Sequence, residues 1–124
     1  PLPGTTYAAD RFVRASFYLS HLPEFKTTRD AVFGVFSVLQ NAGQPMGKQS
    51  PERLLYGYSN WRTVTDLVHR IYYFNSTTTF GIHWTDLTKF NLQPGAPVMK
   101  LDLVNGGDLM GDVTAQYKPA PAFN

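Results

Sequence analysis

The chain has 124 residues, of which 43% are apolar and 15% aromatic, so it can bury a hydrophobic core and does not have the composition of a disordered protein. Its 11 basic and 9 acidic side chains are interspersed and give a net charge of +2, which provides no basic stripe for a nucleic acid backbone. Cysteine is absent, so no disulfide, thiolate metal ligand or cysteine nucleophile exists in these residues, and no apolar run approaches the length of a membrane span.

The first predicted element is an amphipathic helix over residues 7–22, with Thr5 or Thr6 as its N-cap and Pro23 as its end. Apolar residues recur along it at steps of three and four, which is the spacing of one helical face. The predicted buried face consists of Ala8, Phe12, Ala15, Leu19 and Leu22.

Two arginines, Arg11 and Arg14, lie on a neighbouring face of this helix. Asp10 precedes Arg14 by four residues, a spacing that favours a helical ion pair. Arg11 needs a partner, because burying a lone guanidinium is costly. From the residues alone, Arg11 is either a structural member of an ion pair or a site residue that binds an anion or polarises a reacting group.

The second predicted helix covers residues 28–42. Thr27 and Asp30 form a capping-box pattern at its start, and Gly43 is a suitable residue just beyond its end. Gly34 lies inside the helix and indicates close packing against a neighbouring element. The expected buried side consists of Val32, Val35, Phe36, Leu39 and Ala42.

The amino-acid composition changes after residue 59, where aromatic and β-branched residues become frequent. Residues 44–59 are expected to form a surface loop, residues 85–91 a helical turn, and the tail from Lys118 an irregular segment. Two helices followed by strands predict an α+β fold, and the consecutive apolar residues of 71–74 favour a sheet covered on both faces. The expected strands are residues 60–66, 70–75, 77–84 and 98–103, the first two forming an antiparallel hairpin.

Other residues that could support chemistry have ordinary structural explanations. The histidines lack zinc-binding spacing, and nothing singles one out as a general base; they are His21, His69 and His83. Three aspartates near strand ends could pair for acid–base work, although turn capping is their commoner use; they are Asp66, Asp86 and Asp102. We therefore expect neither a metal nor a cofactor.

Three stretches resemble one family in the same order. They are LPG followed by RFVRA (residues 2–4 and 11–15), AVFGVFSVLQNAGQPMG (31–47) and NWRTVTDLVHRIYYFNSTTTFGIHWTDLTKFN (60–91). Together they resemble the choloylglycine hydrolase family, which comprises conjugated bile acid hydrolases and penicillin V acylases. No single stretch would identify the family alone, but the order of the three covers nearly the whole chain.

The resemblance implies an N-terminal nucleophile hydrolase with a four-layer αββα core. In that family an N-terminal Cys is the nucleophile, and its α-amino group, with a pKa of about 8, accepts the thiol proton. Asn side chains and backbone amides hold the oxyanion. By motif matching, Arg11 corresponds to a catalytic arginine of the family, with Arg14 as the less favoured register.

The chain departs from the family pattern because it has no Cys and begins with Pro1. We therefore expect residues 1–124 to be a single segment, the C-terminal part of a larger domain, and to be inactive alone. Its expected partners are the N-terminal part of the same protein and a small-molecule amide: a conjugated bile salt, penicillin V or a related N-acyl amide. No nucleic acid or membrane partner is expected.

The resemblance also implies an assembly and a compartment. Homotetramers are common in the family, and the segment YYFNSTTT (residues 72–79) resembles the Gram-negative members, many of which are exported. This indicates the periplasm, with the cytoplasm as the alternative. The competing function is a non-catalytic binding module, in which Arg11 is structural and the aromatic strands line a hydrophobic ligand site.

Overall fold

The computed structural model describes residues 1–46 and 57–122. The chain divides into two compact units, Pro1–Arg62 and Thr63–Asn124, and each is described by itself. Much of the predicted loop 44–59 lies outside the described residues. Two hydrogen bonds join the ends of this segment. The Ser59 amide donates to the Gln44 carbonyl oxygen, and the Gln44 amide donates to the Ser59 hydroxyl, both at 3.0 Å.

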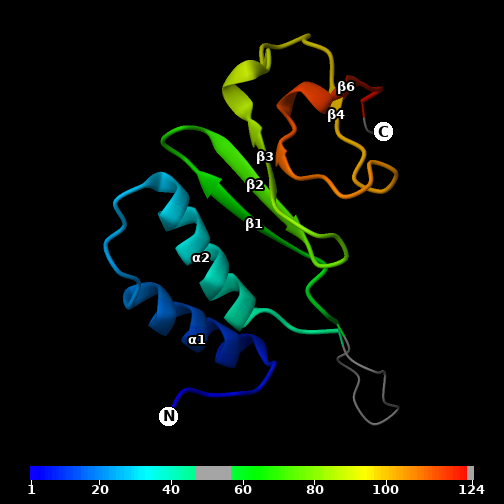
Figure 1. The fold of residues 1–124 in the computed structure, drawn as a ribbon. Helices are drawn as coiled ribbons and strands as arrows, with labels where there is room; N and C mark the ends of the chain where they lie inside the picture. The colour runs from blue at the N-terminus through cyan, green and yellow to red at the C-terminus, as the bar shows by residue number, and fades with distance from the viewer. Residues whose placement is uncertain (47–56, 123–124) are drawn as a thin grey trace. The chain divides into compact units, whose positions relative to one another are not determined.

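The first unit contains the helices α1 (Ala8–Ser20) and α2 (Thr28–Ala42), which lie side by side (Figure 1). The second helix has the predicted bounds. The Thr27 hydroxyl accepts a hydrogen bond from the Asp30 amide at 3.1 Å, which confirms the predicted cap. Four side chains of this helix are buried, three as predicted and Val38 in addition; they are Val32, Phe36, Val38 and Ala42.

The predicted buried face of α1 is wrong. No residue of this helix is buried, and Phe12 and Leu19 are 72% and 56% exposed. The half-buried positions include Arg11, Arg14 and Ala15, so the arginine side of the helix faces inward. The physical reason is that both guanidinium groups donate hydrogen bonds to backbone carbonyl oxygens outside the helix. These bonds can form only when the arginine side of α1 faces inward.

The start of α1 also differs from expectation. The N-cap is Tyr7, and its side chain makes no capping hydrogen bond. Thr5 instead accepts a hydrogen bond from the Tyr7 amide and donates one to the Asp10 carboxylate. Arg14 donates to carbonyl oxygens instead of Asp10, so the predicted Asp10–Arg14 ion pair does not form among the described residues.

The second unit is built on a four-stranded sheet in the order β1-β2-β3-β5, in which β5 is Gly111–Asp112. Figure 1 labels the first three of these strands. The strands β1 (Trp61–Asp66) and β2 (Ile71–Ser76) form the predicted hairpin, and β3 (His83–Asp86) pairs antiparallel to β2. A 3₁₀ turn at Leu87–Lys89 falls within the predicted turn 85–91. All residues of β2 are half-buried, so neither face of that strand lies open to water.

The strand predicted at 77–84 begins much later, at His83. The hydroxyls of Ser76 and Thr78 lie 2.9 Å apart, and the Ser76 hydroxyl also accepts from the Thr78 amide, so this segment forms a polar turn. Gly81 then adopts a φ of +106°, which no extended strand uses.

The strand predicted at 98–103 is reduced to β4 (Met99–Lys100). Asp102 ends it, because its carboxylate accepts hydrogen bonds from the amides of Val104 and Asn105, both at 3.0 Å. The tail from Lys118 was predicted to be irregular, and this prediction is wrong, because β6 (Lys118–Pro119) pairs antiparallel with β4. A further strand, β5 (Gly111–Asp112), pairs parallel to β3 and was not predicted.

Membrane-spanning segments are not found in the described residues, since neither helix there combines the necessary length and apolar character.

Gly34 is expected to be irreplaceable by alanine. A Cβ at this position would lie 2.3 Å from Cζ of the Phe25 ring, far inside van der Waals contact. Gly34→Ala should lower the free energy of unfolding by about 1–3 kcal/mol through overpacking, although an exposed helical Gly→Ala change normally stabilises. Urea unfolding measures the effect.

The control is Phe25→Ala, alone and combined with Gly34→Ala. In the Phe25→Ala background the alanine at 34 should become neutral or stabilising, because the ring that it would meet is gone. A stabilising effect of Gly34→Ala in the wild-type background would contradict the packing explanation.

Asp102 is expected to make the folding stability depend on pH in the acidic range. Hydrogen bonds from the Asn105 side chain and from the amides of Asn105 and Val104 lower the pKa of Asp102 from 3.8 to about 2. Because the folded pKa lies below the unfolded one, the ionised carboxylate stabilises the fold above pH 3.8, and this contribution disappears as the pH falls through about 2. Thermal melts of Asp102→Asn and wild type between these pH values should show a smaller acid-induced loss in the variant.

Asp108→Asn is the matched control, because its carboxylate accepts no hydrogen bond from the described residues. An Asp102→Asn variant with the acid profile of wild type would rule out this role for Asp102.

Candidate functional site

Arg11 in the first unit is anchored at one atom only. Its Nε donates a 2.7 Å hydrogen bond to the carbonyl oxygen of Ala42, the last residue of α2. That carbonyl has no partner within its own helix, so the guanidinium satisfies an orphan acceptor. Within the described part of the chain, the Nη1 and Nη2 groups of Arg11 have no acceptor and no ion pair. Four N–H donors therefore remain to bind an anion or a carbonyl oxygen.

Arg14 is committed to the backbone instead. Its Nη1 donates to the carbonyl oxygens of Pro3 at 2.9 Å and Thr5 at 2.8 Å. These two bonds hold the segment before α1 against the helix. Of the two registers considered for a site arginine, Arg11 is thus the one whose guanidinium has unused donors at both terminal nitrogens.

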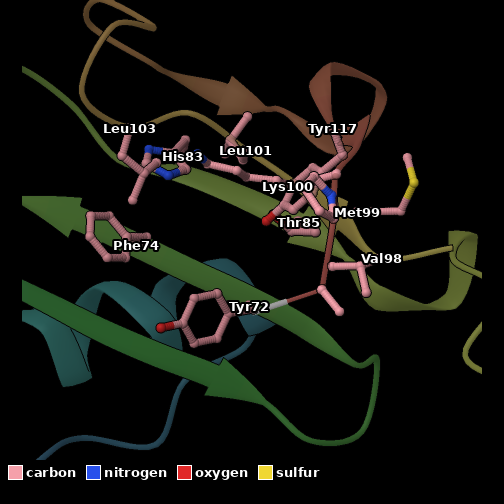
Figure 2. A pocket seen from close by; sticks show the side chains of 13 residues that line it. Tyr72, Phe74, His83, Thr85, Val98, Met99, Lys100, Leu101, Leu103 and Tyr117 are labelled. Atoms are coloured by element: carbon pink, nitrogen blue, oxygen red, sulfur yellow. The ribbon is translucent and has the colours of Figure 1, made fainter. Parts of the chain in front are cut away.

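The second unit contains a cavity of about 530 Å³ over one face of the sheet. Tyr72 and Phe74 alternate along β2, and their direct partners across the ladder are Thr85 and His83 of β3. Since alternate residues share a face, these four side chains form one wall (Figure 2). The predicted aromatic strand thus lines a cavity with half-buried rings.

The remaining walls come from residues 98–103, which are predicted as a strand, and from residues 117–122, which belong mostly to the tail predicted to be irregular. Beyond the sheet residues, the cavity is lined by Val98, Met99, Lys100, Leu101, Leu103, Tyr117, Ala120, Pro121 and Ala122. The pairing of β4 with β6 brings these two segments together, with Met99 opposite Pro119 and Lys100 opposite Lys118. No local sequence signal announces this pairing, because β6 contains a proline and each strand has only two residues.

One hydrogen bond links the sheet to the tail. The Thr85 and Tyr117 hydroxyls lie 3.0 Å apart, and Thr85 is only 3% exposed. The Tyr117 and Phe90 rings also pack edge to face, with their centroids 5.0 Å apart. Tyr117 is therefore fixed at both its hydroxyl and its ring, and it forms a rigid part of the cavity wall.

His83 is the one basic side chain among the four of the sheet wall. It is 6% exposed and stacks on Phe74 with ring centroids 5.2 Å apart. Burial lowers the pKa of His83 below 6.5, and a hydrogen bond with the Leu109 backbone opposes this shift. The imidazole is therefore neutral at pH 7.

The other two histidines lie at element ends. His21 follows α1, where its Nδ1 lies 2.7 Å from the Phe17 carbonyl oxygen and its ring stacks on Phe17. His69 lies in the hairpin turn, with Nδ1 2.6 Å from the Asp66 carboxylate, and it is exposed. Neither lines the cavity.

The three candidate aspartates all cap turns, as their commoner use predicts. Asp66 accepts from the amides of Val68 and His69. Asp86 accepts from the amide and hydroxyl of Thr88, which lowers its pKa. Asp102 caps the turn described above. In residues 1–46 and 57–122 no group of three or more metal-ligating side chains comes together.

Comparison with known proteins identifies the class to which this chain belongs. Residues 1–111 match the family model described as linear amide C-N hydrolases, choloylglycine hydrolase family. The chain belongs to this family, and the resemblance inferred from the sequence is confirmed.

Two penicillin V acylases are similar along nearly the whole chain. The enzyme from Pectobacterium atrosepticum is 36% identical over 137 aligned positions, which cover 98% of this chain and 36% of that protein. The structure of the enzyme from Agrobacterium tumefaciens superposes with a TM-score of 0.85 at 37% identity, covering 99% of this chain and 40% of that one. The α+β prediction is confirmed, and the chain spans well under half the length of these relatives.

The bond between Thr85 and Tyr117 should be energetically significant. Tyr117→Phe leaves the Thr85 hydroxyl buried without this partner, at a cost of about 1–3 kcal/mol in the free energy of unfolding. Guanidinium unfolding measures it.

The double variant Thr85→Val with Tyr117→Phe is the control, since it removes both polar partners and should recover much of the loss. Additive losses in the double variant would show that this hydrogen bond is not what stabilises the contact.

Proposed function

We propose that this chain is the C-terminal part of a cysteine amidohydrolase that cleaves a linear amide C–N bond. The observation that carries the proposal is the family match over residues 1–111. Within it we take Arg11, from its RFVRA motif, as the counterpart of the family's catalytic arginine. The structure supports Arg11 over Arg14, because only Arg11 keeps both terminal nitrogens unused within the described residues.

The chemistry expected of the family defines the task of Arg11. A cysteine outside this chain attacks the amide carbonyl carbon as a thiolate, the C–N bond breaks, and the amine leaves with a proton. The resulting thioester is hydrolysed by water to the free acid. Arg11 would donate hydrogen bonds to the carbonyl oxygen or to an anionic group of the substrate, where charge-assisted bonds are strongest.

Anchoring at Nε suits this task. The bond to the Ala42 carbonyl fixes the guanidinium plane at one edge, so the opposite edge is preorganised and loses little entropy on binding. An arginine held in this way orients a substrate better than a mobile one.

The substrate class, partners and compartment extend the same proposal. A conjugated bile salt, penicillin V or a related N-acyl amide is the proposed substrate, and the N-terminal part of the same protein supplies the nucleophile. We further propose a homotetramer located in the periplasm, with the cytoplasm as the alternative. The two penicillin V acylases among the relatives support penicillin V as the first substrate to test.

The second candidate function is a non-catalytic binding module. The cavity of about 530 Å³ favours it, because a space of this size with aromatic walls is typical of small-molecule sites. In that case Arg11 would serve only to cap α2. Activity of the protein at its full natural length separates the two functions.

Arg11→Ala tests the proposal in the protein at its full natural length. Turnover of penicillin V and of glyco-conjugated bile salts should fall by about 10²-fold or more, as expected for loss of a positioned donor at a developing charge. Folding should be largely retained, because loss of the Ala42 bond costs about 1 kcal/mol. Steady-state kinetics and a thermal melt measure both quantities.

Arg14→Ala is the matched control from the same helix. It should lower the melting temperature through loss of the Pro3 and Thr5 contacts and leave the specific activity of the folded fraction unchanged. A large drop in melting temperature for Arg11→Ala with unchanged activity would make Arg11 a scaffold residue and would refute its proposed role.

A further inference from the structure

The cavity of the second unit has a charge distribution that selects for a class of ligand. Among the described residues that line it, Lys100 is the only one with a charge at pH 7, since none of them is a carboxylate and burial holds the pKa of His83 below 6.5. Asp102, which interacts electrostatically with Lys100, is not part of this lining. Lys100 lies on β4, in the segment that lines the cavity beyond the sheet wall (Figure 2). An anionic group is the complement of a single ammonium in an otherwise uncharged cavity.

The rest of the lining selects for an apolar body. Tyr72 and Phe74 present half-buried rings from β2, and the segment 98–103 adds Val98, Leu101 and Leu103. The volume of about 530 Å³ falls in the range of sites for molecules with one or a few rings. Rings of a ligand can stack on or meet the edges of these aromatic side chains.

Two hydroxyls provide a second polar contact. Thr85 and Tyr117 bond to each other, which uses one of their two protons, so the pair can still donate one hydrogen bond. Both hydroxyl groups belong to residues that line the cavity. A carboxylate, which only accepts hydrogen bonds, matches a site with an ammonium and a spare hydroxyl donor.

We propose that this cavity binds a ring-containing carboxylic acid in its ionised form, with the ring against Tyr72 and Phe74 and the carboxylate at Lys100. The described residues that form this binding site all belong to the second unit, and the site requires neither a cysteine nor Arg11. It therefore stands independently of the amidohydrolase proposal.

The test is direct binding of 4-phenylbutyrate to the protein at its full natural length, measured by isothermal titration calorimetry. The matched probes are 4-phenylbutyramide, which is neutral, and 4-phenylbutylamine, which is cationic. The acid should bind most tightly, up to about fivefold more tightly than the amide, as expected for one solvent-accessible ion pair, and the amine should bind least.

Two variants locate the site. Lys100→Met should remove the preference for the acid over the amide. Lys118→Met is the matched control and should keep this preference, because Lys118 pairs with Lys100 across the ladder but is not among the residues that line the cavity. Leu103→Trp places a large ring at the half-exposed edge of the cavity and should weaken binding of both probes at least severalfold. Thermal melts confirm that each variant is folded.

Several outcomes would overturn the proposal. They are the absence of binding by 4-phenylbutyrate, equal affinity for acid, amide and amine, or an equal effect of Lys100→Met and Lys118→Met. Occupation of the cavity by another segment of the full-length protein would give the first of these. The calorimetry measures binding, whereas the Arg11 variants are tested by turnover. Failure of this proposal therefore does not affect the amidohydrolase proposal, and the two can fail separately.

Discussion

The orientation of α1 in the first unit is favoured by a hydrogen bond between a side chain of this helix and the end of the other helix. The carbonyl of Ala42 has lost its intrahelical partner, because α2 ends there, and Arg11 of α1 donates to it. Leaving that carbonyl unpaired in a part-buried position would be costly. The bond sets which side of α1 turns inward, and Arg14 reinforces that choice through the carbonyls of Pro3 and Thr5. Both arginines therefore favour the same orientation of α1.

Local signals were sufficient for the elements that carry them. The second helix begins after a Thr27 cap and ends before Gly43, as its sequence predicts, and the hairpin of β1 and β2 follows from alternating aromatic and β-branched residues. Two of the predicted strands are wrong where side chains bond to nearby backbone amides. Ser76 and Asp102 each convert a stretch with strand-like composition into a turn. Strands of two residues, such as β5, owe their existence to neighbours far along the chain and have no pattern of their own.

The two candidate sites differ in the same way. The motif predicts Arg11 as a site residue, but it does not state that its Nε is bonded or that its terminal nitrogens have no acceptor among the described residues. Of the cavity, the sequence predicts only that the aromatic strands line a hydrophobic ligand site, and this belongs to the alternative function. Its remaining walls combine residues 98–103 with residues 117–122, and this juxtaposition depends on the pairing of β4 with β6. Periodicity describes one element at a time and therefore cannot reveal a space enclosed by several.

The inward orientation of the arginines has a consequence for the outer side of α1. Phe12 is 72% exposed and Val13 45%, and Phe17, one turn further along, is 42% exposed, so a row of large apolar side chains meets water. The whole chain has a net charge of only +2, which gives little mutual repulsion between copies. This face of α1 would therefore favour association of the isolated polypeptide, together with the exposed apolar side chains of the second unit such as Phe80 and Val104.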